Sequence, residues 1–221
     1  AGEPFTYVWG YKTAGIFQNW EEVNAYTKDG QLIQPDARPG YVRFVDVNDD
    51  GVIDDADRTK IGKGTPDWTF GATFNADWKG FDFMMFWQGT YGNDIFDATR
   101  RLDLPAINLP SWFLGRWTGE GTSDKYPIYI QGDATNWQAS DLYVHDGSYV
   151  RLKNIELGYT IPESITKRAF ISRLRLYVAA ENLLTFTKYW GFDPEISSGS
   201  DKSNGVTSRS EERRVGKECR S

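Results

Sequence analysis

An unbroken alternation of side-chain type runs through the middle of the chain, at Trp68–Trp78. Every even position in this stretch is apolar, and every odd position is small or polar. This period of two predicts a β-strand with two different faces, because successive side chains of a strand point to opposite sides. A turn signal at Lys79-Gly80 and a second alternating run at Phe81–Tyr91 follow directly. The two runs therefore predict an antiparallel hairpin.

The length of this hairpin bears on the choice between a membrane barrel and a soluble sandwich. At about 3.3 Å per residue, Trp68–Trp78 spans roughly 33 Å. A tilt of about 40° reduces this to roughly 25 Å, which is the height of the apolar band of an outer-membrane barrel. The terminal tryptophans would then lie in the two aromatic girdles. Soluble strands usually have about 5–6 residues, so the length favours the barrel, and a sandwich hairpin with a core face is the alternative.

The composition suits a barrel as well. Aromatic residues make up 15% of the 221 residues, yet the mean hydropathy is only -0.56. Alternating strands give this combination because the apolar side chains are averaged with their polar neighbours. A formal net charge of -6 disfavours a general nucleic-acid-binding surface. No window approaches the roughly 20 consecutive apolar residues of a membrane helix.

Two further strands are predicted downstream. The first, at 148–160, is apolar on one parity, but Arg151 and Lys153 fall on that same parity near one end. We expect both basic side chains to extend toward the headgroup level of the membrane. The second strand alternates from Leu174 to Ala180 and beyond. Together with the hairpin, these strands predict an all-β fold, a partial transmembrane antiparallel β-barrel.

Loop lengths predict an orientation, because outer-membrane barrels have short periplasmic turns and long external loops. The connections at Lys79-Gly80 and Pro162 are short, and the segments on the other side of the strands are long. The predicted barrel portion, 1–207, divides into external loop regions at 12–66 and 92–147 and strands at about 67–91 and 148–186.

An acidic segment at Asp46–Asp57 fits the template of a calcium-binding loop, with Gly51 at the sharp turn. The predicted ligands are Asp46, Asn48, Asp50, Val52 through its backbone carbonyl, Asp54 and Asp57. The last ligand position holds aspartate instead of glutamate, so the loop resembles that of dockerins more than that of a cytosolic sensor. The alternative is an acidic turn that binds no metal.

Several short motifs occur in a characteristic order along residues 7–196. They are Gly10-Tyr11-Lys12-Thr13, Asp46–Asp57, Asp146–Ile155, Leu157-Gly158-Tyr159, Glu181–Thr187 and Gly191–Glu195. Each motif is weak alone, but the ordered set resembles the C-terminal part of SusC/RagA-family TonB-linked outer-membrane proteins. The resemblance covers nearly all of the chain.

The resemblance implies a role, a location and partners. It implies a TonB-dependent importer in the outer membrane of a Gram-negative bacterium, which takes up a glycan or a peptide. The implied partners are outer-membrane lipid, a SusD-like surface lipoprotein that covers the barrel, and the TonB complex. The TonB complex would act through a plug domain that is not in this sequence. No covalent chemistry, organic cofactor or nucleic acid is implied.

Two rival classes stay open from the residues alone. One is a soluble calcium-dependent binding or adhesion module, and the other is a secreted glycan-active enzyme. No carboxylate pair can be assigned a glycosidase role, and His145 has no histidine or cysteine companion in the sequence for zinc or triad chemistry. Trp112, Trp117 and Trp137 could stack on sugars or dock a partner, but packing within the loops is the simpler role for each.

The two ends of the chain differ from the rest. The chain starts at Ala1 without an export signal, so we expect this start to be an internal position of a longer exported protein. The segment 208–221 is highly charged, has no strand pattern and contains the single cysteine, Cys219. We interpret it as a vector-derived tail that replaces the final strand expected from the family resemblance.

Overall fold

The computed structural model describes residues 7–97, 111–191, 193–195 and 206–207. The proposed tail at 208–221 lies outside the described residues. The chain divides into two compact units. The loop unit comprises 1–65, 94–145 and 196–221, and the sheet unit comprises Pro66–Asn93 and Asp146–Glu195. In the described part of the chain, no helix has both the length and the apolar character needed to cross a membrane.

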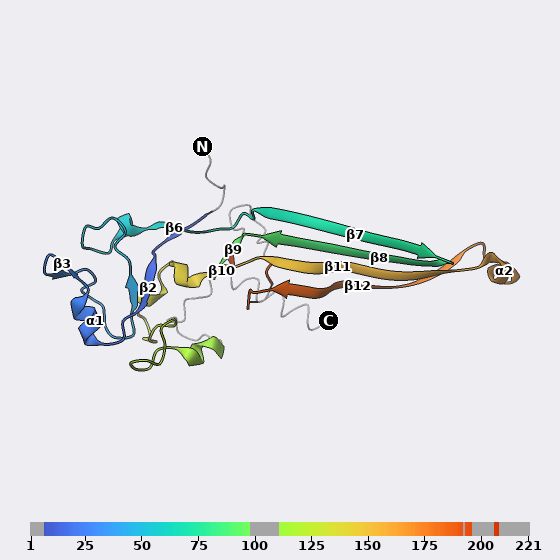
Figure 1. Cartoon of the computed structure of the whole chain (residues 1–221). Helices are drawn as coiled ribbons and strands as arrows, with labels where there is room; N and C mark the ends of the chain where they lie inside the picture. The colour runs from blue at the N-terminus through green and yellow to red at the C-terminus, as the bar shows by residue number, and fades with distance from the viewer. Residues whose placement is uncertain (1–6, 98–110, 192, 196–205, 208–221) are drawn as a thin grey trace. The chain divides into compact units, whose positions relative to one another are not determined.

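The sheet unit is built on four long antiparallel strands (Figure 1). They are β7 (Trp68–Trp78), β8 (Phe81–Tyr91), β11 (Tyr149–Ile161) and β12 (Leu174–Thr187), in the spatial order β12-β11-β8-β7. The hairpin β7–β8 is closed by Lys79 and Gly80, both with positive φ, 47° and 88°. This two-residue turn matches the right-handed twist of the strands that it joins.

The register aligns most of the apolar residues of the four strands on one face. A representative row crosses the sheet through Phe74, Met85, Ile155 and Ala180. The alternation seen in β7 therefore continues across the whole sheet, because side chains of directly paired residues lie on the same face. The other face carries the threonines and the acidic and basic residues of the same strands, together with Met84 and Phe86 of β8.

A β-bulge interrupts β11 at Lys153. Between Leu152 and Asn154, β11 advances by two residues while β8 advances by one, from Trp87 to Phe86. One extra residue reverses the parity of a strand. Leu152 therefore joins the apolar face, and Arg151 lies on the opposite face.

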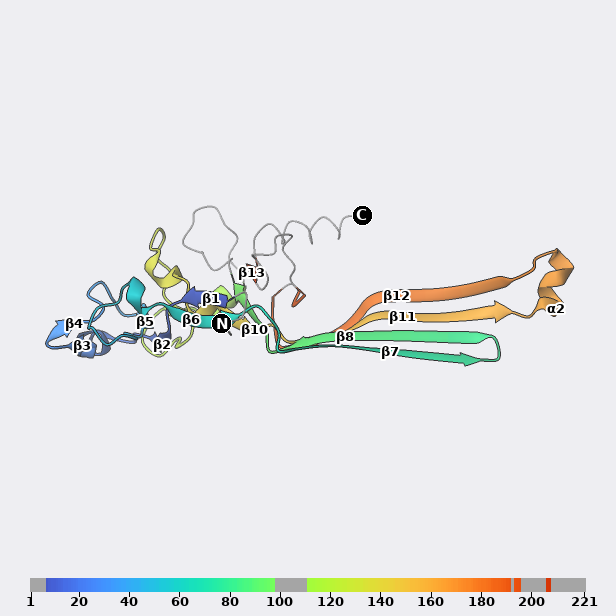
Figure 2. The ribbon, with the colours of Figure 1, turned by 90° about the horizontal axis from the view of Figure 1, so that it is seen from above.

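A short helical connection joins β11 to β12 beyond the end of the sheet (Figure 2). It contains α2 (Glu163–Thr166) and the 3₁₀ turn η6 (Lys167–Ala169). Thr166 is buried, and its carbonyl accepts a hydrogen bond from the Ile171 N–H, which closes the connection.

The loop unit is more ordered than a pair of external loops would suggest. Its short elements, with β10 ending at the boundary of the sheet unit, are β1 (Tyr7–Gly10), β2 (Thr13–Ile16), α1 (Trp20–Ala25), β3 (Thr27–Lys28), β4 (Gln31–Leu32), β5 (Val42–Phe44), η1 (Asp55–Asp57), β6 (Thr59–Lys63), β9 (Asp94–Asp97), η3 (Ser111–Gly115), η4 (Thr135–Trp137), η5 (Asp141–Tyr143), β10 (Val144–Asp146) and β13 (Val206–Thr207). The pairs β1–β6, β2–β5 and β3–β4 are antiparallel. Helix α1 begins where the side chain of Asn19 accepts the Glu22 N–H at 3.0 Å.

Three small apolar clusters hold the loop unit together. One contains Phe96, Phe113, Trp137 and Tyr143, a second contains Phe17, Val23, Ala37 and Tyr41, and a third contains Tyr11, Val42 and Phe44. Periodicity does not reveal these clusters, because their members come from short strands and turns that are far apart in the chain.

Candidate functional site

One face of the sheet unit is a continuous apolar surface that is open to its surroundings. Its large exposed side chains include Trp68, Phe70, Phe74, Trp78, Phe81, Leu157, Leu176, Val178, Leu184 and Phe186. The exposed fraction reaches 71% at Trp68 and 77% at Val178. Soluble monomers rarely expose contiguous apolar patches above a few hundred Å², so this face is made for a non-aqueous environment.

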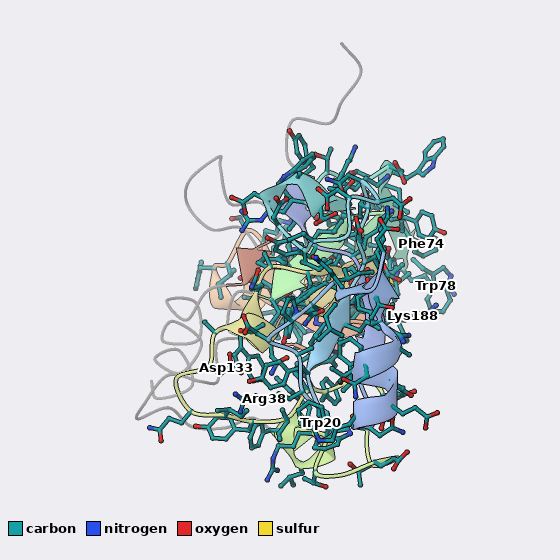
Figure 3. All side chains as sticks on the ribbon, turned by 90° about the vertical axis from the view of Figure 1, so that its left-hand side faces the viewer. Trp20, Arg38, Phe74, Trp78, Asp133 and Lys188 are labelled. Carbon is teal, nitrogen blue, oxygen red and sulfur yellow. The ribbon has the colours of Figure 1, made fainter. Side chains whose placement is uncertain are left out.

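The exposure of this face distinguishes a barrel from a soluble sandwich. A sandwich would bury Phe70 and Phe74 against a second sheet, but they are 44% and 54% exposed. Figure 3 shows Phe74 and Trp78 pointing away from the ribbon. Within the described residues of the sheet unit there is only one sheet. The structure therefore agrees with the barrel prediction and does not support the sandwich alternative.

The opposite face carries charge. Arg175 on β12 forms ion pairs with Asp82 on β8 and with Glu156 on β11. Between them lies Gly158, where an added Cβ would come within 2.5 Å of the Arg175 guanidinium and the Asp82 carboxylate. Because Gly158 has no side chain, the Arg175 side chain can cross β11 and reach Asp82 on β8.

A second ionic cluster surrounds Arg151, whose side chain is 8% exposed. Its guanidinium binds Asp193 at 2.5 Å and Glu195 at 2.8 Å, and its Nε donates to the Thr185 hydroxyl at 2.9 Å. Lys153 binds the same Glu195 oxygen at 2.5 Å. The expectation that Arg151 and Lys153 extend from the apolar face was wrong, because the bulge at Lys153 turns both toward these carboxylates.

The acidic loop Asp46–Asp57 is closed by its last residue. Asp57 is fully buried, and one carboxylate oxygen accepts the Val47 N–H at 2.8 Å while the other accepts the Asp54 N–H at 2.9 Å. Asp54 caps η1 in turn by accepting the Ala56 N–H at 2.7 Å. The last predicted ligand thus ties the two ends of the loop together.

The remaining predicted ligands make hydrogen bonds within the turn. The Asp46 carboxylate accepts the N–H groups of Asp50 and Gly51 at 3.2 and 2.7 Å. Asn48 donates to Asp50 at 2.8 Å, and Asp50 accepts the Val52 N–H at 3.0 Å. Among the residues that the structure describes, no three acidic, histidine or cysteine side chains form a group able to hold a metal ion. Calcium binding at this loop stays a prediction.

The tryptophans singled out from the sequence have different surroundings. Trp137 is 2% exposed and packs in a core cluster of the loop unit. Trp112 stacks on Tyr126 at a centroid distance of 4.7 Å, and the Trp117 indole N–H donates to Gln18 at 3.2 Å. All three therefore take part in packing of the loop unit. His145 lies at β10, and burial lowers its pKa.

The loop unit also contains an open polar cavity of about 680 Å³. Its lining includes Gln18, Glu22, Arg43 and Glu120. The Arg43 guanidinium donates to the Ala14 carbonyl at 2.7 Å. Neither the periodicity nor the motifs of the sequence indicate this cavity, because its walls come from segments about a hundred residues apart.

Comparison with known proteins places these features in a family, although no family model matches the chain. The chain is similar to TonB-dependent receptor P3 of Formosa agariphila, with 36% identity over 90% of this chain and 19% of the relative. TonB-dependent receptor SusC of Bacteroides thetaiotaomicron is 25% identical over 80% of this chain and 18% of the relative. A solved structure of the RagAB peptide importer in the open-open state matches with a TM-score of 0.61 and 24% identity, over 90% of this chain and 20% of that chain.

The chain thus spans about a fifth of the length of the proteins that it matches. The similarity to receptors by sequence, the match to the RagAB fold and the two-faced sheet agree with one another. The chain is a portion of the outer-membrane β-barrel of a TonB-dependent receptor of the SusC/RagA family.

Proposed function

We propose that this chain forms part of the wall and the external loops of a TonB-dependent importer that takes up a large nutrient. The observation that carries the proposal is the segregation of the sheet into an apolar face and an ionic face. A wall between lipid and an aqueous interior requires this division, because each strand of such a barrel alternates lipid-facing and interior-facing residues. The apolar face would contact outer-membrane lipid, and the face with Arg175 and Arg151 would line the interior.

The names of the relatives support a transport role and a ligand class. One relative is SusC, and one solved structure is a peptide importer. We infer that the ligand is a glycan or a peptide, which a surface lipoprotein of the SusD type hands to the barrel. The polar cavity of the loop unit offers both amide and carboxylate groups to such a ligand. The TonB complex would supply the energy through parts of the receptor beyond this chain.

Two other functions have less support. The named relatives are receptors and an importer, which favours transport over a secreted glycan-active enzyme. A soluble adhesion module is inconsistent with the open apolar face of the sheet. Calcium at Asp46–Asp57 would fit the importer equally well, as a structural ion of an external loop.

Uptake in the native host tests the proposal. A strain lacking the receptor gene is supplied with fluorescently labelled glycan and peptide fractions, and complementation restores the complete receptor. We expect the deletion to abolish uptake of one fraction, a TonB deletion to do the same, and a surface lipoprotein to copurify with the receptor in detergent. Unchanged uptake of every fraction in the deletion strain would contradict the proposal.

A further inference from the structure

The connection between β11 and β12 exposes apolar side chains beyond the end of the sheet. Phe170 is 99% exposed, Ile165 is 60% exposed and Ile171 is 39% exposed. Phe170 also has a φ of 58°, a left-handed conformation that is unfavourable for a bulky residue. Strained backbone of this kind is often found where a segment serves binding, so the exposed phenylalanine points to a partner that shields it.

The same connection is basic within an acidic chain. Residues 162–173 contain the basic residues Lys167, Arg168 and Arg173 against a single acidic residue, Glu163, whereas the whole chain has a net charge of -6. Lys167 pairs with Glu163 at 2.7 Å, but its side chain is 71% exposed and stays accessible. Positive charge concentrated beside exposed apolar groups is complementary to an anionic amphiphile.

The position of the connection identifies that amphiphile. The last rows of the sheet before it contain Trp78, Phe81 and Tyr159, which the register places on the apolar face. The rings of Phe81 and Tyr159 are 4.5 Å apart, and the Lys79 ammonium lies 4.9 Å from the centre of the Trp78 ring. Aromatic residues concentrate where the membrane meets water. The connection begins immediately past this aromatic row and therefore falls at the headgroup level.

We propose that residues 162–173 are a phospholipid-binding anchor. Phe170 and Ile165 insert among the headgroups, and Lys167, Arg168 and Arg173 bind the phosphates of anionic phospholipids. Continuity with the lipid face and charge complementarity both favour lipid over a protein occupant. The inference rests on the membrane placement of the sheet and is independent of what the receptor transports, so it can fail while the importer proposal holds.

The insertion of Phe170 is tested by fluorescence in the complete receptor. The variant F170C, as the single cysteine, is labelled with an environment-sensitive fluorophore in nanodiscs of phosphatidylethanolamine and phosphatidylglycerol. We expect brominated acyl chains to quench this label at least several-fold more than a label at L114C. Leu114 is the matched control, because it is 82% exposed on η3 of the loop unit. Equal quenching at both sites, or a label at 170 that is shielded but not quenched, overturns the anchor.

The charge requirement is tested by lipid selectivity. The variant K167Q/R168Q/R173Q is compared with K12Q/R38Q/K125Q, which removes the same number of basic residues from the loop unit, and heat-modifiable gel migration establishes that both receptors are folded. We expect the first variant alone to lose most of the enrichment of phosphatidylglycerol over phosphatidylethanolamine seen by native mass spectrometry. Unchanged enrichment, or an equal loss in the control, overturns the proposal. The labelling result decides the case if the triple variant does not fold.

Discussion

Arg175 on β12 crosses the intervening strand β11 to bind Asp82 on β8, and the Arg175 Nε–Asp82 Oδ1 distance is 3.0 Å. The contact is possible because the position crossed is Gly158, which has no side chain on this face. Three neighbouring strands are thus fixed to one another by a charge-assisted contact in addition to their backbone ladders. The motif Leu157-Gly158-Tyr159 therefore has a physical reason that its apolar alternation does not reveal.

The first prediction follows from that arrangement. Replacing Gly158 with valine places a Cβ within 2.5 Å of both partners and separates Arg175 from Asp82. We expect the temperature at which the folded receptor loses its heat-modifiable form to fall by several degrees. Gly119→Val is the control, because no atom lies within 4 Å of a Cβ built there. A Gly158→Val receptor as heat-stable as the control would show that the bridge contributes nothing.

The second prediction concerns Arg151. Its side chain is 8% exposed and bound by Asp193 and Glu195, so Arg151→Met removes the cation that these carboxylates share and leaves Glu195 paired with Lys153 alone. We expect a loss of about 1.5–3 kcal/mol in the free energy of unfolding, measured by denaturant titration of the receptor in vesicles. Lys167→Met removes an exposed pair instead and should cost less than about 0.5 kcal/mol. Equal losses in the two variants would rule out a special role for the Arg151 cluster.

Arg151 also shows which parts of the fold could be predicted from the sequence and which could not. The unbroken period in β7 and the alternation in β8 predicted the hairpin, its turn and its apolar face, because alternation and register depend on local pattern. The bulge at Lys153 could not be predicted, since it depends on how β11 pairs with two neighbours at once. Parity counted through the bulge therefore assigned Arg151 to the wrong face.

The acidic loop and the core clusters of the loop unit also contain contacts that could not be predicted from the sequence. The spacing of Asp46–Asp57 indicated a specific turn, but not that the Asp57 carboxylate is buried beneath the N–H groups of Val47 and Asp54. Trp137 and Tyr143 pack together although both lie in irregular segments. Contacts of this kind join short elements without periodicity, so no pattern in the sequence specifies them.

The third prediction addresses calcium. If Asp46–Asp57 binds the ion, titration of the receptor with Ca²⁺ should show a dissociation constant on the order of 10⁻⁴ to 10⁻³ M, as in extracellular modules. Asp46→Ala should weaken binding at least tenfold, because it removes the first ligand, whereas Asp36→Ala outside the loop should not. Absence of any heat change or luminescence from the substitute ion Tb³⁺ at millimolar concentration would establish the metal-free turn instead.

The fourth prediction is an alkaline effect at Tyr41. Burial, followed by a hydrogen bond to Asp133, raises the pKa of Tyr41 from 10.0 to about 12. Because the folded pKa exceeds the unfolded value, the stabilisation is fully present below pH 10 and is lost as the pH rises toward 12. Burial also raises the pKa of Tyr26, so ultraviolet titration should show a late step whose amplitude falls by one tyrosine in Tyr41→Phe and is unchanged in the control Tyr7→Phe. An undiminished late step in Tyr41→Phe would contradict the assignment.

The central claim is that the two faces of β7 meet lipid and water respectively, and site-directed spin labelling of the complete receptor in vesicles measures this most directly. Labels are placed singly at Phe70, Ala72 and Phe74 and at Thr69, Gly71 and Thr73. We expect the even positions to be accessible to oxygen dissolved in the bilayer and the odd positions to a water-soluble nickel reagent, with a strict period of two. Equal access of the nickel reagent to both sets, or the reverse alternation, would contradict a lipid-facing wall.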